Sequence, residues 1–333
     1  MRVGVVGASG FMGAELVRLL ASHPRAEIAM LAGGESAGKT MRQVRPGFDL
    51  DILIEEPIAD VLSARCDVVF LALPHGRSAD AAYELLERGT PVFDLGSDFR
   101  LRTPQQAERW YGKAAPYDGL LNEAVYALPE LTGGPPPNAR LVACPGCFAT
   151  ALNLTLAPLA DLLTEEDQVS CFGITGSSGS GIQPSPGVHH SLRMTGFTAY
   201  KPLAHQHTGE VDQLLEERGA KFSYSFVPHS APVARGIHIT TVIPRGAGMT
   251  YQTYQSFFEG KPLIHVQEGP VNMGAVVGTC RVLIGVSGDE RESAVFIAID
   301  NLLKGGSGQA VQNLNLWRGW PELDGLPLHA LWP

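Results

Sequence analysis

The chain has 333 residues, 44% of them hydrophobic and 18% charged, and its formal net charge is −9 at pH 7. This length exceeds what a single hydrophobic core usually covers, so we expect two domains. The excess of acidic residues argues against nucleic acid or an anionic membrane as the main partner. The sequence has neither a signal-peptide pattern at its amino terminus nor an apolar stretch that could span a bilayer, so we expect a cytoplasmic protein.

Strand and helix patterns alternate over the first hundred residues. Short apolar runs predict strands at Val3–Val6, Ala26–Ala32, Asp67–Leu73 and Pro91–Leu95, with helices at Phe11–Ser22 and Ser78–Arg88. This alternation builds βαβ units, in which consecutive strands are parallel. We therefore predict an α/β domain with a Rossmann-type, doubly wound parallel sheet.

The pattern changes after about residue 150, where longer strands follow one another with fewer helices between them. These strands are predicted at Val169–Thr175, Phe222–Val227, Gly236–Ile243, Thr279–Val286 and Ala294–Ile299. This order is typical of an α+β domain with a mostly antiparallel sheet. We place the dinucleotide-binding domain at residues 1–146, completed by a returning segment at 301–333, and a catalytic and oligomerisation domain at 147–300.

A glycine-rich loop, Gly7-Ala8-Ser9-Gly10-Phe11-Met12-Gly13, joins the first predicted strand to the first helix. Glycines permit a tight turn and let backbone N–H groups approach a pyrophosphate at the helix N-terminus. The GxxGxxG spacing alone also fits an ordinary turn. The order strand, loop, helix, strand favours dinucleotide binding.

The loop after the second strand, Gly33-Gly34-Glu35-Ser36-Ala37-Gly38-Lys39, bears on the choice of dinucleotide. A carboxylate such as that of Glu35 holds the ribose 2′-hydroxyl of NAD, whereas Ser36 and Lys39 suit the 2′-phosphate of NADP. A solvated loop with no role in selectivity is the third reading.

Five cysteines, an odd number, argue against a disulfide framework and for one functional thiol. Cys147 follows a predicted strand end, Leu141–Ala143, and directly precedes a predicted helix from Phe148 to about Leu163. The dipole and unpaired N–H groups of a helix N-terminus stabilise a thiolate and can stabilise an oxyanion. Such a thiolate suits reduction of an activated acyl group through a thioester. The alternative is a Cys144–Cys147 redox pair; no matching second pair appears, so no metal site is expected.

Two histidines, His205 and His207, stand just before a helix predicted to begin near Val211. One of them is a candidate acid/base for the thiol, although ten histidines make a chance pair common. Arg235 opens a predicted strand, where it either clamps a substrate carboxylate or is an ordinary strand-end charge.

Taken together, these residues resemble the N-acetyl-gamma-glutamyl-phosphate reductase family of arginine biosynthesis over nearly the whole chain. The most specific stretch is Val142-Ala143-Cys144-Pro145-Gly146-Cys147-Phe148-Ala149-Thr150-Ala151, in which Cys147 falls on the nucleophile. The other matching stretches are 7–13, Leu73-Pro74-His75-Gly76, 94–100, His205-Gln206-His207, 300–305 and 308–313.

The resemblance implies NADPH-dependent reduction of N-acetyl-L-glutamyl 5-phosphate to the 5-semialdehyde and phosphate, through a thioester on Cys147. It implies that a histidine of the pair, for which we favour His207, assists proton transfer. It also implies that Pro74, Asn301 and residues 33–35 lie near the cofactor, and that the protein is a homodimer or homotetramer. Relatives often carry an arginine near position 34 or 35, which this sequence lacks, so NAD stays open as the cofactor.

A sister family reduces aminoadipyl or glutamyl phosphate attached to an acidic carrier protein, in lysine or arginine biosynthesis. Residues 184–190 and Tyr200-Lys201-Pro202 resemble that group. A surface that docks an acidic carrier should be basic, which the overall charge disfavours and a local basic patch would permit. A non-catalytic dinucleotide sensor, using Cys144 and Cys147 to report redox state, is the third alternative.

Overall fold

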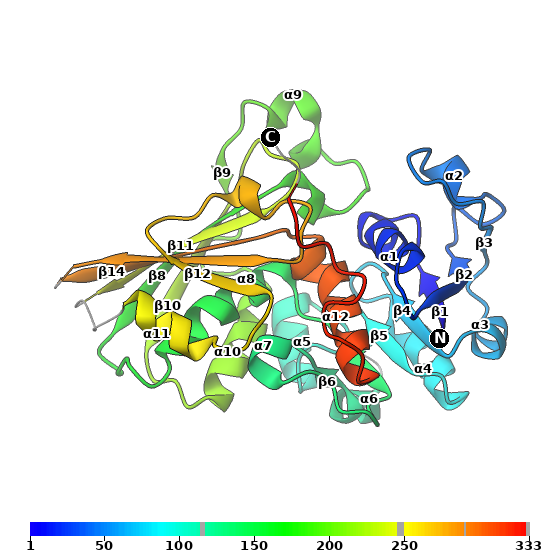
Figure 1. The fold of residues 1–333 in the computed structure, drawn as a ribbon, viewed down its shortest axis with the longest axis horizontal. Coiled ribbons are helices and arrows are strands. Elements are labelled where there is room, and N and C mark those ends of the chain that lie inside the picture. Colours follow the sequence, from blue (N-terminus) through cyan, green and yellow to red (C-terminus); the bar gives the residue numbers. More distant parts are fainter. Residues whose placement is uncertain (114–116, 245–249, 290, 331–333) are drawn as a thin grey trace. The chain divides into compact units, whose positions relative to one another are not determined.

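The computed structural model describes residues 1–113, 117–244, 250–289 and 291–330. The chain forms two compact units (Figure 1). The first unit comprises Met1–Pro145 and Gly306–Leu326, and the second comprises Gly146–Gly305 and Pro327–Pro333. Each unit is built around its own seven-stranded sheet.

The sheet of the first unit has the strand order β3-β2-β1-β4-β5-β7-β6, and all its strand pairs are parallel. The strands are β1 (Arg2–Val6), β2 (Glu27–Ala32), β3 (Ile54–Glu55), β4 (Val68–Leu71), β5 (Val92–Asp94), β6 (Val125–Tyr126) and β7 (Leu141–Ala143). The chain runs outward from β1 in one direction and then returns to β4 on the other side of β1. This confirms the predicted doubly wound sheet. Every residue of β4 is buried, as expected for a parallel strand covered on both faces.

Helices follow most strands of the first unit. They are α1 (Phe11–Ala21), α2 (Met41–Val44), α3 (Ala59–Arg65), α4 (Ala79–Glu87), α5 (Pro104–Tyr111), α6 (Asp118–Glu123), α7 (Pro129–Thr132) and α12 (Gly308–Trp317). The last of these, α12, packs against α1. The Asn313 amide of α12 donates to Ala127 O (3.0 Å), and the ring of Trp317 meets that of Phe93 edge-on. The carboxyl-terminal helix is thus part of the core of this unit.

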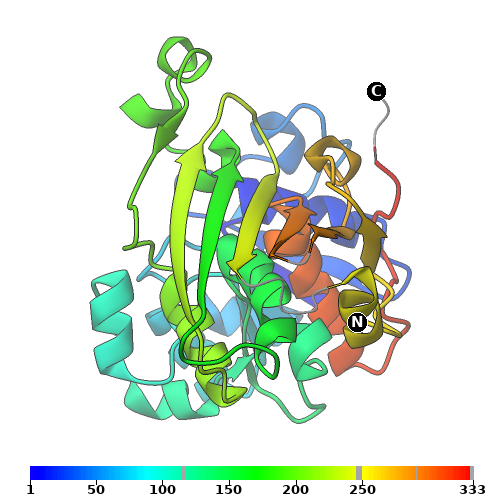
Figure 2. The ribbon, with the colours of Figure 1, turned by 90° about the vertical axis from the view of Figure 1, so that its left-hand side faces the viewer.

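The sheet of the second unit has the order β12-β13-β14-β11-β8-β10-β9. Its strands are β8 (Gln168–Thr175), β9 (Thr198–Ala199), β10 (Ser223–Ser230), β11 (Ile237–Pro244), β12 (Ile264–Glu268), β13 (Val282–Gly288) and β14 (Glu292–Ile299). Two neighbouring pairs, β8–β10 and β12–β13, are parallel, and the others are antiparallel. The prediction of a mostly antiparallel sheet is confirmed. Figure 2 shows β10, β8 and β11 side by side.

One face of this second sheet is covered by helices α8 (Cys147–Leu156), α10 (Thr208–Glu217) and α11 (Tyr251–Phe257), which lie on the same side of the strands in Figure 1. Gly173 of β8 faces this side, since a Cβ there would lie 2.7 Å from the ring of Phe148. Its neighbour Phe172 points the opposite way and is 45% exposed. The described residues therefore leave the opposite face of the sheet partly open.

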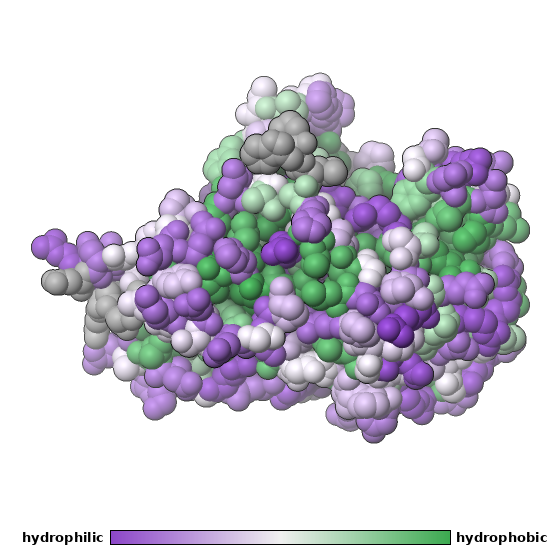
Figure 3. Space-filling model, in the orientation of Figure 1, coloured by the Kyte–Doolittle hydropathy of each residue, from purple (hydrophilic) through white to green (hydrophobic). Residues whose placement is uncertain are grey.

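Figure 3 shows apolar side chains in two areas, one in the middle of the view and one at its right-hand side, with mostly hydrophilic side chains along the lower edge and at the left. A small buried cluster in the second unit joins Val271, Val276 and Ala298, with Met273, Leu283 and Phe296 packed against it. No helix within the described ranges is both long and apolar enough to cross a membrane.

Short elements complete the second unit. They are the 3-10 turns at Ala157–Leu159, Ser177–Ser180, Pro186–Val188 and Met273–Ala275, helix α9 (His190–Arg193) and a π-helical turn η5 at Leu303–Ser307. Residues 181–203, which we call the projecting segment, include α9 and β9 and extend beyond the sheet in Figures 1 and 2.

Candidate active site

The glycine-rich loop has a geometry that only glycine permits. Gly7 has a φ of +82°, and a Cβ there would lie 2.4 Å from Ala72 O. A Cβ on Gly13 would lie 2.1 Å from Gly7 O, so the first turn of α1 packs directly on the loop. Helix α1 begins at Phe11, and its N-cap residue Gly10 makes no side-chain capping bond. The first N–H groups of α1 are therefore free of a side-chain cap, which suits a pyrophosphate at this helix end.

The loop after β2 lies against the glycine-rich loop. The hydroxyls of Ser9 and Ser36 are hydrogen-bonded at 2.7 Å, and a Cβ on Gly33 would lie 3.9 Å from the Ser9 hydroxyl. Gly34 and Glu35 are exposed. The guanidinium of Arg45, which ends α2, donates to Ser9 O and Val44 O. Sequence reasoning missed Arg45, because it is nine positions after Ser36 and only the fold returns it to Ser9.

Residues 94–100, at the end of β5, hold the backbone segments that follow the neighbouring strands β4 and β7. The carboxylate of Asp98 accepts N–H groups from Gly76 (2.7 Å), Ser78 (2.9 Å) and Ala79 (3.0 Å). It thereby fixes the turn that begins at Pro74 and leads into α4. Arg100, which is 4% exposed, donates to Cys144 O and Leu95 O, both at 2.8 Å. These two motif residues have structural roles, one on each side of β5.

Cys147 is the first residue of α8, as the sequence predicts. It is partly exposed, whereas Cys66, Cys144, Cys171 and Cys280 are buried. Burial raises the pKa of the Cys144 and Cys171 thiols to about 12 and that of Cys66 to about 11. A thiol with such a pKa stays protonated near neutral pH, so these three cysteines are poor nucleophiles.

Two side chains of α10 and its N-cap bind the start of α8. The carboxylate of Glu210, which is fully buried, accepts the N–H of Gly146 at 2.9 Å. The Nδ1 atom of His207 accepts the N–H of Phe148 at 3.2 Å. We expected these helix N–H groups to be available to a substrate oxyanion; two of them are instead capped by Glu210 and His207.

The contact with Phe148 also sets the tautomer of His207. Because Nδ1 accepts a backbone N–H, it carries no proton, so the neutral ring carries its proton on Nε2. The imidazole lies against the backbone of Gly146, where a Cβ would be 2.5 Å from Nε2. His207 is thus a hydrogen-bond donor held beside the residue that precedes Cys147.

His205 is 3% exposed, and its Nδ1 atom accepts the N–H of His207 at 3.2 Å. Its ring meets those of Phe148, Tyr200 and His207 edge-on. Burial, assisted by the charge of Lys201, lowers the pKa of His205 to about 4. This imidazole is therefore neutral near pH 7 and supports the backbone of its neighbour.

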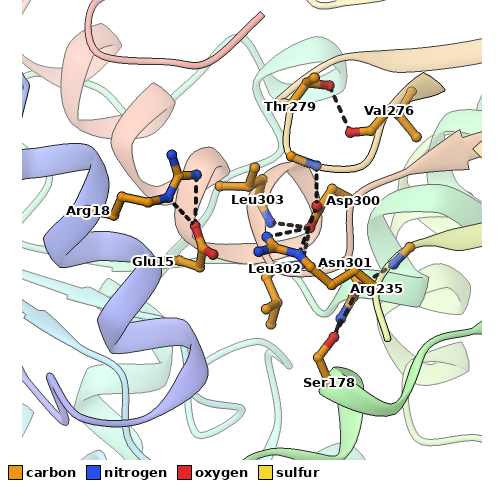
Figure 4. A network of polar contacts seen from close by, with 12 residues as sticks. Glu15, Arg18, Ser178, Arg235, Val276, Thr279, Asp300, Asn301, Leu302 and Leu303 are labelled. Atoms are coloured by element: carbon orange, nitrogen blue, oxygen red, sulfur yellow. Dashed lines mark hydrogen bonds and ion pairs between the residues drawn. The ribbon is translucent and has the colours of Figure 1, made fainter. Parts of the chain in front are cut away.

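Asp300 and Asn301 connect several segments at the end of β14 (Figure 4). The buried carboxylate of Asp300 accepts N–H groups of Gly278, Leu302 and Leu303 at 2.8 to 3.1 Å. Asn301 accepts the N–H of Gly236 at 2.7 Å and donates to Ser178 Oγ at 3.0 Å. The predicted cofactor residue Asn301 thus holds the start of β11 and the turn after β8.

Arg235 forms an ion pair with Asp300, with two nitrogen–oxygen distances of 3.1 Å (Figure 4). Its side chain is 26% exposed and that of Asp300 is fully buried. The sequence offered Arg235 as a possible ligand for a substrate carboxylate. In the structure its positive charge is already paired with the carboxylate of Asp300. Nearby, a Cβ on Gly305 would lie 2.8 Å from the Cβ of Cys147, so the π-helical turn closely approaches Cys147.

Among the residues that the structure describes, His, Cys, Asp and Glu side chains form no group of three suited to a metal ion. The side chains gathered at this site include the thiol of Cys147, the imidazoles of His205 and His207 and the carboxylate of Glu210.

Two domain families match the chain: the semialdehyde dehydrogenase NAD binding domain over residues 2–134, and the semialdehyde dehydrogenase dimerisation domain over residues 147–301. Aspartate semialdehyde dehydrogenase II of Vibrio cholerae, solved in complex with ASA, shares the fold with a TM-score of 0.72 at 17% identity, covering 96% of this chain and 98% of that one. The enzyme of Candida albicans, solved with NADP, gives 0.67 at 17% identity, with 95% and 98% covered. The chain therefore belongs to the semialdehyde dehydrogenase class, with which it shares both domains.

Relatives of higher sequence identity show which family of this class the chain belongs to. A LysW-L-2-aminoadipate/LysW-L-glutamate phosphate reductase of Saccharolobus solfataricus is 38% identical, covering 100% of this chain and 99% of the relative. N-acetyl-gamma-glutamyl-phosphate reductases of Synechococcus elongatus (38%; 99% and 98% covered) and Shouchella clausii (36%; 100% of both covered) are similarly related. The chain belongs to the family formed by these phosphate reductases, as the motif at 142–151 predicts.

Proposed function

We propose that this protein reduces N-acetyl-L-glutamyl 5-phosphate to N-acetyl-L-glutamate 5-semialdehyde and phosphate with NADPH, as a step of arginine biosynthesis. The chain is an NAD(P)-dependent oxidoreductase of the semialdehyde dehydrogenase class. The observation that carries the proposal is the placement of Cys147: it alone of the five cysteines is not buried, and it begins a helix. A substrate of this kind needs such a thiolate, because acyl transfer to sulfur turns an acyl phosphate into a thioester.

In the first step, the sulfur of Cys147 attacks the acyl carbonyl and the bond to the phosphate oxygen breaks. The dipole of α8 stabilises the attacking thiolate. The departing phosphate takes up the one proton that the overall reaction consumes.

The second step reduces the thioester, and NADPH supplies the hydride when it is bound. The resulting oxyanion expels the Cys147 thiolate and becomes the aldehyde. His207 serves as the donor to that oxyanion through Nε2–H, because its Nδ1 atom is occupied by the N–H of Phe148. In this scheme His205 acts only by supporting His207.

We assign the cofactor to the first unit. Gly7, Gly10, Gly13 and the start of α1, including Phe11 and Met12, form a cradle that fits the pyrophosphate. Ser9, Gly33 to Ser36 and Pro74 complete the set that we expect to contact it. NADP is favoured because Arg45 brings a guanidinium to Ser9, whose hydroxyl is bonded to that of Ser36, and a 2′-phosphate would need such a cation.

The test is the reverse reaction, in which semialdehyde, phosphate and NADP yield NADPH. Cys147→Ala should abolish it and leave NADPH binding unchanged. Cys144→Ala is the matched control and should stay active, since Cys144 is buried. Retained turnover in Cys147→Ala contradicts the proposal, and equal loss in both variants favours the redox-sensor alternative.

A second candidate substrate is an acyl phosphate carried by an acidic protein. Between Asp167 and Glu210 the sequence contains no acidic residue, in a chain of net charge −9. The same stretch exposes the apolar side chains of Ile182, Leu192, Met194, Phe197 and Leu203. Leu203 is 68% exposed and its φ is +60°, a strained conformation for leucine. A basic surface with exposed apolar groups suits an acidic protein partner.

The two candidate substrates are distinguished by measuring kcat/KM for free and for carrier-bound acyl phosphate. The carrier function predicts a strong preference for bound substrate that weakens as salt rises, because exposed charges are screened. A higher kcat/KM for free substrate, independent of salt, supports the first candidate.

We also propose that the protein is a homodimer or a larger homo-oligomer. The match of residues 147–301 to a dimerisation domain supports this assignment. We assign the contact to the open face of the second sheet, on which Phe172 is 45% exposed.

A further inference from the structure

Arg193, at the end of α9, reaches from the projecting segment back to the sheet. Its Nη2 atom donates to Thr175 O at 3.1 Å, and Nη1 donates to the hydroxyl of Ser230. Thr175 and Ser230 are the last residues of the adjacent parallel strands β8 and β10. The guanidinium is thereby fixed at the same end of both strands.

This guanidinium has no acidic partner among the described residues, and its Nε atom is buried without a hydrogen-bond partner. The nearest acidic residues in the sequence are Asp167 and Glu210. Burial lowers the pKa of Arg193, and the one group that opposes this effect is Tyr200. A partly buried cation with an unused N–H group is costly unless an anion meets it. Arg235 differs, because Asp300 already matches its charge.

Tyr200 links Arg193 to the nucleophile. Burial raises the pKa of its hydroxyl, the charge of Cys147 raises it further, and the charge of Arg193 lowers it. The Tyr200 ring meets that of His205, which in turn meets Phe148, the residue after Cys147. Arg193 and Cys147 therefore act on the same hydroxyl within the second unit.

We infer that Arg193 binds the carboxylate of the acyl substrate and so selects substrates that carry one. This inference rests on the proposed function and names its specificity residue. The planar guanidinium suits a carboxylate, and Nη1 and Nη2 each have a second N–H besides those given to Ser230 and Thr175. Because the α-carboxylate is common to free and carrier-bound glutamyl or aminoadipyl phosphates, the assignment holds for both candidate substrates.

The first test measures the electrostatic field at Cys147 without any substrate. Iodoacetate and iodoacetamide alkylate thiols by the same displacement of iodide, but only iodoacetate is an anion. The rate ratio of the two reagents at Cys147, followed by peptide mass spectrometry, should fall about tenfold in Arg193→Met, since one charge-assisted hydrogen bond is lost. The control Lys221→Met removes an exposed cation elsewhere in the second unit and should keep the wild-type ratio.

The second test compares two aldehydes in the reverse reaction: N-acetyl-glutamate semialdehyde and 4-acetamidobutanal, which lacks only the carboxylate. Wild type should prefer the first. Arg193→Met should lose that preference by about tenfold to a hundredfold, mainly through KM, and Arg193→Lys should restore part of it. A purely structural role of Arg193 would lower kcat/KM for both aldehydes equally.

The outcomes are distinct. An unchanged alkylation ratio in Arg193→Met, or equal losses for both aldehydes, overturns the inference and leaves the proposed function standing. A Cys147 that neither reagent alkylates, in a wild-type enzyme inactive on both aldehydes, contradicts the proposed function and this inference with it.

Discussion

At the start of α8, Gly146 has no side chain because the imidazole of His207 occupies that space: a Cβ would lie 2.5 Å from Nε2. The same imidazole caps the N–H of Phe148, and Glu210 caps that of Gly146 itself. Gly146, the residue before the proposed nucleophile Cys147, thus decides where the Nε2 atom of His207 lies. The position of the His207 imidazole is thus set both by its close packing on Gly146 and by its hydrogen bond from Phe148.

Gly146→Ala should therefore displace His207 and lower kcat by roughly a hundredfold, the usual cost of moving a catalytic group by about 1 Å. NADPH affinity should stay unchanged, because we assign the cofactor to the glycine-rich loop of the first unit. Gly187→Ala is the matched control, since a Cβ there meets nothing within 4 Å. Steady-state kinetics and NADPH fluorescence titration measure the two effects; an unimpaired kcat in Gly146→Ala would contradict the role of His207.

His205 gives a prediction about pH and stability. Its pKa in the fold is about 4, below the ordinary value of 6.5, so the unfolded chain binds more protons between these limits. Above pH 6.5 this difference does not reduce the free energy of unfolding. As the pH falls from 6.5 towards 4, the free energy of unfolding decreases by about 3 kcal/mol at most, because the unfolded chain binds the proton more tightly.

Other groups titrate in the same range. Burial raises the pKa of Asp94 to about 6, which acts with the opposite sign. The difference between wild type and His205→Asn isolates the histidine, and the amide oxygen of asparagine can still accept the N–H of His207. Urea unfolding from pH 4 to 7.5 should show a shallower loss in the variant; parallel curves for the two proteins would show that His205 does not titrate in this way.

At the scale of elements, the sequence was informative wherever local pattern and local chemistry agreed. The apolar run before Cys144, followed by Pro145 and Gly146, predicts that Cys147 opens a helix, and it does. The helix ends at Leu156 rather than near Leu163, because Pro158 lacks the N–H that would continue it, and a 3-10 turn follows. Strand β10 extends three residues past its predicted end to Ser230, since its pairing with β8 outweighs the proline at 228.

Contacts between elements distant in sequence could not be predicted in this way. The role of Glu210 depends on packing of α10 against α8, and Arg45 reaches Ser9 because the segment after β2 lies against the glycine-rich loop. No local spacing encodes either contact.

Arg45 leads to the prediction at this scale. Removing its guanidinium in Arg45→Met should lower the ratio of kcat/KM for NADPH to that for NADH by about tenfold to a hundredfold, the usual range for one charge-assisted bond to phosphate. Arg42→Met, in the same helix, removes a cation that pairs with Asp49 and Asp51 instead, and should leave the ratio unchanged. If Arg45→Met lowers activity with both cofactors equally, selectivity resides elsewhere in the loop.

At the scale of the whole molecule, the second sheet has one face packed by α8, α10 and α11 and one that its own unit leaves partly open. Along the open face, the strand register places Phe172 beside Val227 and Thr240, and Thr240 beside Phe296. An apolar row of this kind is stabilised when a second sheet covers it. A two-fold axis would bring the same row of a second copy onto it, so one substitution changes both sides of the contact.

Phe172→Glu therefore places two carboxylates in the proposed contact and should weaken the dimer at least a hundredfold, since each buried charge without a partner costs several kcal/mol. The fold should survive, because the side chain is 45% exposed in the single chain. Leu162→Glu is the matched control: Leu162 is 46% exposed and lies just after the 3-10 turn that continues α8, a helix on the other face of the sheet. Sedimentation velocity over a range of concentrations should show monomer for Phe172→Glu and unchanged assembly for Leu162→Glu. An intact dimer in Phe172→Glu would mean that the copies meet through another surface, whereas a monomeric Leu162→Glu would assign the contact to the helical side.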